Sequence, residues 1–130
     1  MKEIQLHTSI QEELLVTEAL LACNVGSGSV CVYATPMMIA AMEHAACSAL
    51  APFLEEGETS VGIMIHSSHD AATPQGMKVF VEATITAVKG KKVSFEIIAR
   101  DEKDMIGKAT HDRFIVVQER FEAKANQKKG

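Results

Sequence analysis

The feature that most constrains the fold is a long apolar helix with a single acid, predicted over residues 35–50. The helix begins at Thr35-Pro36, and its next dozen residues are almost all alanine, methionine, isoleucine or cysteine, with Glu43 as the one acidic side chain. Threonine is a favoured N-cap and proline suits the first helical position, so we expect Thr35 to cap this helix. A helix that is apolar on nearly all sides needs a sheet that wraps around it.

Alternating sequence patterns predict the strands of that sheet. The expected strands cover residues 30–33, 59–69, 77–89, 93–99 and 105–117, and residues 10–22 fit either a strand or a short helix. Within 77–89 the apolar face is expected to run from Met77 to Ala87. Tight turns between consecutive strands favour antiparallel pairing. The sequence therefore predicts an α+β fold, in which a curved antiparallel sheet encloses one long central helix.

Length and charge limit the classes of function. The chain has 130 residues, which fits one domain over 1–130 with peripheral segments at 1–9 and 118–130. A net charge of -4 argues against a nucleic-acid partner, which needs a basic face. No apolar run approaches the ~20 residues of a membrane span, so no membrane partner is expected. A unit this small leaves sheet edges open, which predicts a homodimer or a higher oligomer.

The cysteine pattern bears on the cellular compartment. Cys23, Cys31 and Cys47 are odd in number and form no CxxC pair. We interpret them as reduced thiols of a cytoplasmic protein. His66 and His69 form an HxxH motif, but positions i and i+3 of a strand point to opposite faces, so no metal site is expected.

One acid and one histidine at element ends indicate an acid–base site. Glu43 lies inside the apolar helix, where a carboxylate is costly unless it has partners or a task. His69 ends the strand predicted over 59–69 and precedes a second Thr-Pro pair at Thr73. Each residue also has a structural interpretation: Thr35 as an N-cap only, Glu43 as a paired acid, and His69 as an ordinary strand-end histidine.

Five blocks of sequence, in order along the chain, carry a family resemblance. They are Tyr33-Ala34-Thr35-Pro36, Glu43-His44-Ala45, and the segments 56–62, 69–76 and 106–114. These blocks resemble the hotdog-fold thioesterases of the fluoroacetyl-CoA thioesterase-like family, over about residues 30–125. The resemblance implies a hotdog fold, hydrolysis of an acyl-CoA thioester to free acid and coenzyme A without a cofactor, and a homodimer with active sites at the subunit interface.

The resemblance also implies roles for individual residues. Thr35, Glu43 and His69 would be catalytic, Gly62 would lie by the thioester oxygen, and Arg113 would lie near the substrate entrance. A thioester needs a nucleophile, a base and donors to the oxyanion. Glu43 suits a nucleophile or a base for water, His69 a proton carrier, and Thr35 a hydroxyl at a helix N-terminus. Whether Thr35 or Glu43 attacks the carbonyl stays open.

Two further positions concern substrate binding. Gly62 has no Cβ, so a ligand can approach its backbone closely. His111 shares strand parity with Arg113, and the two either line the mouth of the site or form ordinary polar pairs.

The resemblance does not transfer the identity of the acyl group. The segment 23–29, where the family builds a lid over the acyl group, contains no aromatic residue. A small or medium acyl-CoA and an aryl-acyl thioester are therefore as open as fluoroacetyl-CoA. Two alternatives remain: a non-catalytic acyl-CoA-binding module, and a hotdog hydratase or dehydratase. Thr35, Glu43 and His69 together argue against a binding module, which needs no acid–base residues. Their spacing resembles that of the thioesterases more than that of a hydratase or dehydratase.

Overall fold

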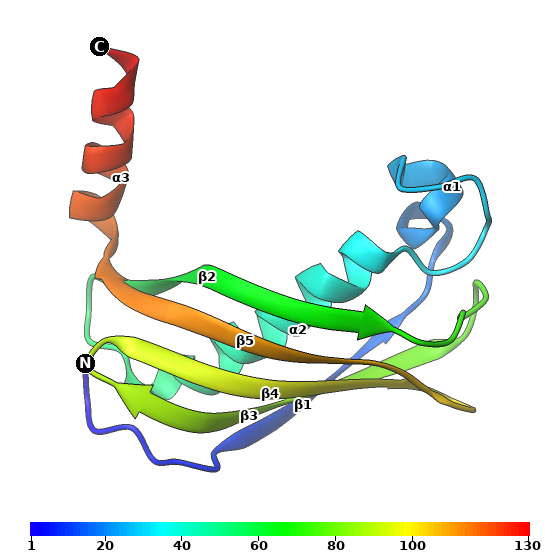
Figure 1. The fold of residues 1–130 in the computed structure, drawn as a ribbon, viewed down its shortest axis with the longest axis horizontal. Coiled ribbons are helices and arrows are strands. Elements are labelled where there is room, and N and C mark those ends of the chain that lie inside the picture. The colour runs from blue at the N-terminus through cyan, green and yellow to red at the C-terminus, as the bar shows by residue number, and fades with distance from the viewer.

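The computed structural model describes residues 1–130 and contains one antiparallel sheet of five strands. The strands are β1 (Ser9–Leu15), β2 (Glu58–His69), β3 (Lys78–Lys89), β4 (Lys92–Asp101) and β5 (Met105–Val117). They pair in the order β1-β3-β4-β5-β2, and the long helix α2 (Thr35–Leu50) lies along one face of the curved sheet (Figure 1). The predicted fold class, a curved antiparallel sheet with one long helix, is confirmed.

Helix α2 spans the predicted residues, but its first residue does not have the predicted role. Ala34, not Thr35, is the N-cap, because the Ala34 carbonyl accepts the first helical hydrogen bonds, from the amides of Met37 and Met38. No side chain caps the helix. The expectation that Thr35 is the N-cap is therefore wrong, and its hydroxyl is available for another partner.

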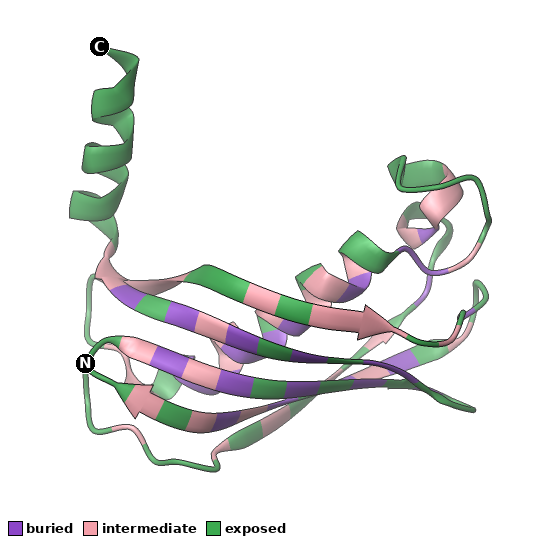
Figure 2. Ribbon diagram, in the orientation of Figure 1, coloured by how far each residue is buried: buried purple, intermediate pink, exposed green.

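One face of α2 is buried and the opposite face is open in the single chain. The buried residues are Met38, Met42, Ala45, Ala46, Ala49 and Leu50. Pro36, Ala40 and His44 are exposed, because the sheet covers only one side of the helix (Figure 2). The helix is therefore less enclosed than its composition suggests, and Glu43 lies at the border between the two faces.

Alternation in β3 and β4 builds most of the core. The alternate residues of β4 from Val93 to Ala99 are buried, as are those of β3 from Val79 to Ile85. The register shifts between Ile85 and Ala87, so Ala87 is exposed and Val88 packs against the core instead. The predicted inward position of Ala87 is wrong because this bulge reverses the alternation.

The strand order differs from a simple series of hairpins. Only β3, β4 and β5 follow one another through tight turns, whereas β2 pairs with β5 at one edge and β1 pairs with β3 at the other. Residues 30–33 do not form a strand; Tyr33 makes a single bridge to Leu21. The undecided segment 10–22 contains most of β1, then a turn of 3-10 helix at Glu18–Leu20, and α1 (Ala22–Val25) follows.

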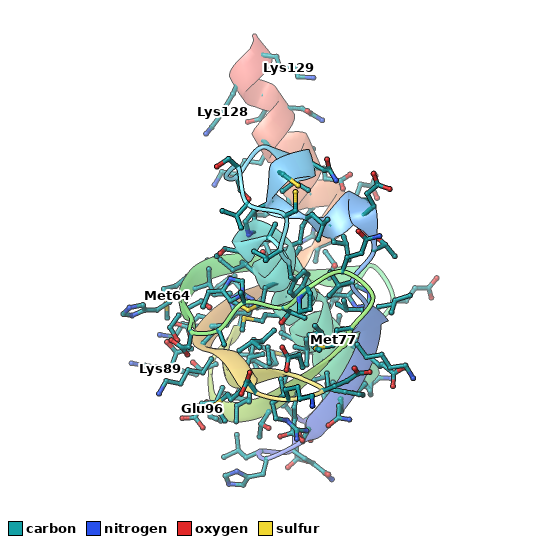
Figure 3. All side chains as sticks on the ribbon, turned by 90° about the vertical axis from the view of Figure 1, so that its right-hand side faces the viewer. Met64, Met77, Lys89, Glu96, Lys128 and Lys129 are labelled. Carbon is teal, nitrogen blue, oxygen red and sulfur yellow. The ribbon has the colours of Figure 1, made fainter.

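The C-terminal helix α3 (Gln118–Asn126) has no buried residue and projects away from the sheet (Figure 1). Two further 3-10 turns lie at Ala51–Phe53 and Gln127–Lys129. Lys128 and Lys129 lie at the far end of the projection, where Figure 3 labels them. None of the helices has the length and apolar character that a membrane crossing requires.

Candidate active site

The first cluster of candidate residues joins the start of α2 to the end of β2. The Thr35 hydroxyl oxygen lies 2.7 Å from Nδ1 of His69. The other ring nitrogen of His69, Nε2, is buried without a hydrogen-bond partner. Burial lowers the pKa of His69, against a smaller raising effect of Asp70. The neutral imidazole is therefore favoured near pH 7, and its Nδ1 can accept the hydroxyl proton of Thr35.

A buried tyrosine forms a wall beside this pair. The ring of Tyr33 meets the ring of His69 edge-on, with centroids 6.4 Å apart and planes at 80°. Tyr33 is 1% exposed; its amide donates to the Thr73 carbonyl at 2.8 Å and its hydroxyl donates to the Met37 carbonyl at 3.3 Å. Burial raises the pKa of Tyr33 to about 12, so its hydroxyl stays protonated and acts as a fixed donor.

A buried hydrogen bond fixes the loop that follows His69. The Thr73 hydroxyl donates to Oδ2 of Asp101 at 2.8 Å, and both residues are buried. Burial raises the pKa of Asp101, but hydrogen bonds from the amides of Asp104 and Lys103 and from Thr73 outweigh it and lower the pKa overall. This pair was not predicted from the sequence. Asp101 occupies the next inward-facing position of β4 after Ala99. A carboxylate at an inward-facing strand position was the sequence feature that could have indicated it.

A cavity of about 270 Å³ lies at the Thr35–His69 pair. Its lining residues are Ala22, Ser27, Val32, Tyr33, Thr35, His69, Asp70, Ala71 and Ala72. A larger cavity of about 470 Å³ is lined by β2, β4 and β5, but Thr35 and Glu43 are absent from its wall. We place the candidate site at the smaller cavity because an acid–base pair faces it.

The second cluster surrounds Arg113, which is 6% exposed. Its Nη1 lies 3.2 Å from Oε2 of Glu43 and 3.1 Å from Nε2 of His111. Its Nε donates to the Ser60 hydroxyl at 2.8 Å. Since Nδ1 of His111 donates to the Met64 carbonyl at 2.7 Å, Nε2 of that ring is the acceptor for Arg113. Burial and the Arg113 charge lower the pKa of His111, which therefore stays neutral.

Gly62 faces this cluster rather than an open space. A Cβ at Gly62 would lie 2.7 Å from Oε2 of Glu43 and 3.2 Å from Cε1 of His111. Gly62 pairs with Arg113 across the β2–β5 ladder. The absence of a side chain at Gly62 therefore makes room for the Glu43 carboxylate within the chain. Glu43 itself is 42% exposed, so it is less buried than its apolar helix suggests.

The structure thus brings the predicted residues together in two clusters instead of one. Thr35 and His69 form the first; Glu43, Gly62, His111 and Arg113 form the second. Thr35 and Glu43 are eight positions apart on α2, which corresponds to about 12 Å along the helix axis. Ser60, which binds Arg113, was not singled out from the sequence; its only signal was a polar residue two positions before Gly62 on the same face.

Comparisons with known proteins agree with this architecture. The sequence model of the FlK family, described as fluoroacetyl-CoA-specific thioesterase, matches residues 16–119. A fluoroacetyl-CoA thioesterase of Streptantibioticus cattleyicolor is 44% identical over 97 residues, which cover 75% of this chain and 70% of that protein. A solved structure of the fluoroacetyl-CoA thioesterase FlK has a TM-score of 0.92 at 33% identity, and the match covers 98% of both chains.

More distant structures extend the same comparison. A Thermus thermophilus protein described as a thioesterase superfamily member has a TM-score of 0.91 at 31% identity, with 99% of this chain and 96% of that chain covered. A hot-dog-like protein from Thermanaerovibrio acidaminovorans shares the fold at 20% identity, with a TM-score of 0.88. The curved sheet around α2 therefore defines a hotdog-fold protein. Within that class, the chain belongs to the fluoroacetyl-CoA-specific thioesterase family, as its sequence blocks predicted.

Proposed function

We propose that this protein hydrolyses small or medium acyl-CoA thioesters to free acid and coenzyme A, with Thr35, Glu43 and His69 as its reactive groups. Family membership makes it a thioester hydrolase, and its relatives are named for the fluoroacetyl-CoA substrate. The observation that carries the proposal is the 2.7 Å contact between the Thr35 hydroxyl and His69 at a cavity of about 270 Å³. A hydroxyl paired with a neutral imidazole is an activated nucleophile.

We assign each group one step in the reaction. Nδ1 of His69 takes the proton of Thr35 as its hydroxyl oxygen attacks the thioester carbonyl. The Thr35 amide at the start of α2 is the one donor there without a backbone partner, since Pro36 has no N–H and the amides of Met37 and Met38 bond to the Ala34 carbonyl; we assign it to the charge that develops on the carbonyl oxygen. The tetrahedral intermediate then expels the coenzyme A thiolate, which takes the proton from His69. Glu43 then deprotonates a water molecule, which attacks the acyl-Thr35 ester and breaks the bond to the Thr35 oxygen. The Thr35 oxygen takes the proton of the new acid, which leaves as a carboxylate, and Glu43 returns its proton to solvent.

A homodimer accounts for the separation of the two clusters. β2 pairs with β5 along one side and leaves its other side free, where Ile63 is 52% and Met64 is 43% exposed (Figure 3 labels Met64). An open, apolar edge strand favours pairing with a second copy. We propose that each active site combines Thr35 and His69 of one copy with Glu43 of the other.

The acyl group that fits follows from the cavity wall. Alanine side chains at positions 22, 71 and 72 line it, and no aromatic ring from the segment 23–29 reduces its volume. We therefore propose that the site takes acyl chains beyond two carbons. The buried apolar side chains between Val16 and Ile115 form one cluster, which supports a single domain. The three free cysteines support a cytoplasmic location.

A thiol-release assay over acyl-CoAs from acetyl to octanoyl, with fluoroacetyl-CoA and an enoyl-CoA included, tests the function. Free thiol with the wild type, and loss of it in Thr35→Ala and Glu43→Gln, is the expected result. Consumption of an enoyl-CoA without thiol release would instead identify a hydratase, and binding without turnover would identify a binding module. Either outcome overturns the proposal.

Co-expression of Thr35→Ala with Glu43→Gln tests the shared site. Random assembly makes about half of the dimers mixed, and each mixed dimer has one site with neither lesion, so about a quarter of wild-type activity should return. If both residues act within one chain, every site carries one lesion and activity stays at the level of the single variants. That result would refute the shared arrangement while leaving the hydrolase function intact.

A further inference from the structure

We propose that Cys23 and Cys31 form a reversible dithiol–disulfide switch in the segment that lines the Thr35–His69 cavity. The bond between the two sulfurs stands on geometry alone. Its effect on catalysis rests on the hydrolase function proposed above.

The two thiols are already in contact. The Cys23 thiol donates to the sulfur of Cys31 with the two Sγ atoms 2.6 Å apart. A disulfide bond is about 2.05 Å long, so closure requires a movement of roughly half an ångström. Cys31 is exposed and Cys23 is half-buried, so a small oxidant can reach the pair. Cys47 is half-buried on α2 and serves as an internal control.

Backbone pairing, and not only side-chain rotation, sets the two cysteines opposite each other. Three hydrogen-bonded or bridged pairs precede them with antiparallel spacing: Leu20 with Ala34, Leu21 with Tyr33, and Ala22 with Val32. Cys23, the second residue of α1, and Cys31 follow directly after the last of these pairs in the two segments. The chain between them turns back through Gly26, whose φ of 83° lies in the left-handed region.

The segment between the cysteines is part of the cavity wall. Ala22 and Val32, the immediate neighbours of the two cysteines, line the cavity together with Ser27, which lies between them. Thr35 and His69 line the same cavity. A covalent bond across the base of this segment would limit its motion and thus the space that an acyl chain can occupy.

The chemistry balances with a peroxide as oxidant. Cys31 is the exposed thiol of the pair, so the oxidant reaches it first; the hydrogen bond that Cys23 donates to Cys31 raises the pKa of the Cys23 thiol. The Cys31 sulfur attacks the O–O bond of hydrogen peroxide, giving a sulfenic acid and one water. The Cys23 sulfur then attacks the sulfenic sulfur, forming the S–S bond and releasing a second water. Both sulfurs are oxidised, the peroxide is reduced, and a dithiol reductant reverses the change.

Peptide mass spectrometry tests the bond directly. Hydrogen peroxide is added to the reduced protein, remaining thiols are alkylated, and the digest is analysed without reductant. The expected result is a Cys23–Cys31 cross-link that has lost two hydrogen atoms, with Cys47 alkylated. In Cys23→Ser, the sulfenic acid on Cys31 should persist and react with dimedone. Full alkylation of both cysteines after peroxide, or a bond to Cys47, would overturn the proposal whatever the enzyme hydrolyses.

Steady-state kinetics test the effect on the site. Oxidation should lower kcat/KM for octanoyl-CoA by about threefold or more relative to acetyl-CoA, and dithiothreitol should restore it. Cys47→Ser should respond to peroxide as the wild type does, and Cys31→Ser should not respond. Unchanged constants in a protein with the confirmed cross-link would refute the regulatory part. If the reduced protein hydrolyses no acyl-CoA, the proposed function fails and the cross-link result still stands.

Discussion

Replacing Glu43 by glutamine separates the structural task of this acid from its chemical one. Glu43 lies 3.2 Å from Arg113, a distance at which unit charges attract by about 5 kcal/mol at an effective dielectric constant of ~20. The Glu43 side chain is 42% exposed, so water screens most of that attraction and about 1–2 kcal/mol remains. Glutamine keeps an oxygen acceptor for Arg113, which also keeps its bonds to Ser60 and His111.

We therefore expect Glu43→Gln to fold and to lose about 4–8 °C in melting temperature, since ~1 kcal/mol corresponds to about 4 °C for a chain of this size. Thiol release from the acyl-CoA that the wild type hydrolyses best should fall by about a hundredfold or more, which is about 2.7 kcal/mol of barrier. A stability loss of this size leaves the protein folded at 25 °C, so it does not explain the rate loss.

Glu12→Gln is the matched control. Glu12 accepts hydrogen bonds from His44 and Ser48 on the same helix, outside both clusters. The amide there should leave thiol release within about twofold of the wild type. If Glu43→Gln also keeps its rate within threefold, Glu43 is only a partner of Arg113 and the proposed mechanism is wrong. If the melting temperature does not change, the ion pair adds nothing to stability.

Four further predictions concern the first cluster and its support. Because burial lowers the pKa of His69, the neutral form should persist below the ordinary value of about 6.5, and activity should decline only under more acidic conditions; folded His69→Ala should lack this acid limb in a pH–rate profile. Because the folded pKa of His69 is lowered, its contribution to the free energy of unfolding is fully present above about pH 6.5, the unfolded value, and is lost as the pH falls through the folded pKa. Melting temperatures measured across that pH range test this. Thr35→Ala loses no cap bond but does lose the hydrogen bond to His69, about 0.5–1.5 kcal/mol, so it should melt about 2–6 °C below the wild type and release little thiol, whereas Thr35→Ser should stay active. In Gly107→Ala, the new Cβ would lie 2.6 Å from the Ser68 carbonyl oxygen, so calorimetry should show a loss of about 1–3 kcal/mol; an unchanged transition would contradict this packing.

Hydrophobic periodicity along the chain predicted most helices and strands, because these elements form where neighbouring residues share one apolar face. The bounds of α2 and of β5 follow from runs of about a dozen residues with one period, and the structure agrees with both. The predictions fail where contacts with residues far away in the sequence determine the local structure. Ala87 leaves the predicted face at a bulge against β4, and residues 30–33 pair with the segment at 20–22 instead of joining the sheet.

The site was less predictable than the fold for the same reason. Sequence blocks identified Thr35, Glu43 and His69, but they did not reveal which of these meet. Glu43 binds Arg113, which is 70 positions away, and His69 binds Thr35, which is 34 positions away. Such pairings depend on the order of strands in the sheet, and β2 lies beside β5 rather than beside its neighbour in sequence.

The missing side chain at position 62 couples two positions that are far apart in the chain. Any Cβ there would displace the Glu43 carboxylate, which lies 2.7 Å from that point. Aspartate is one methylene shorter, so a chain with alanine at 62 regains space only if position 43 also shortens. Substitutions at Gly62 and Glu43 are therefore tolerated more easily together than singly, so we expect the residue at 62, on β2, to vary only with the residue at 43, on α2.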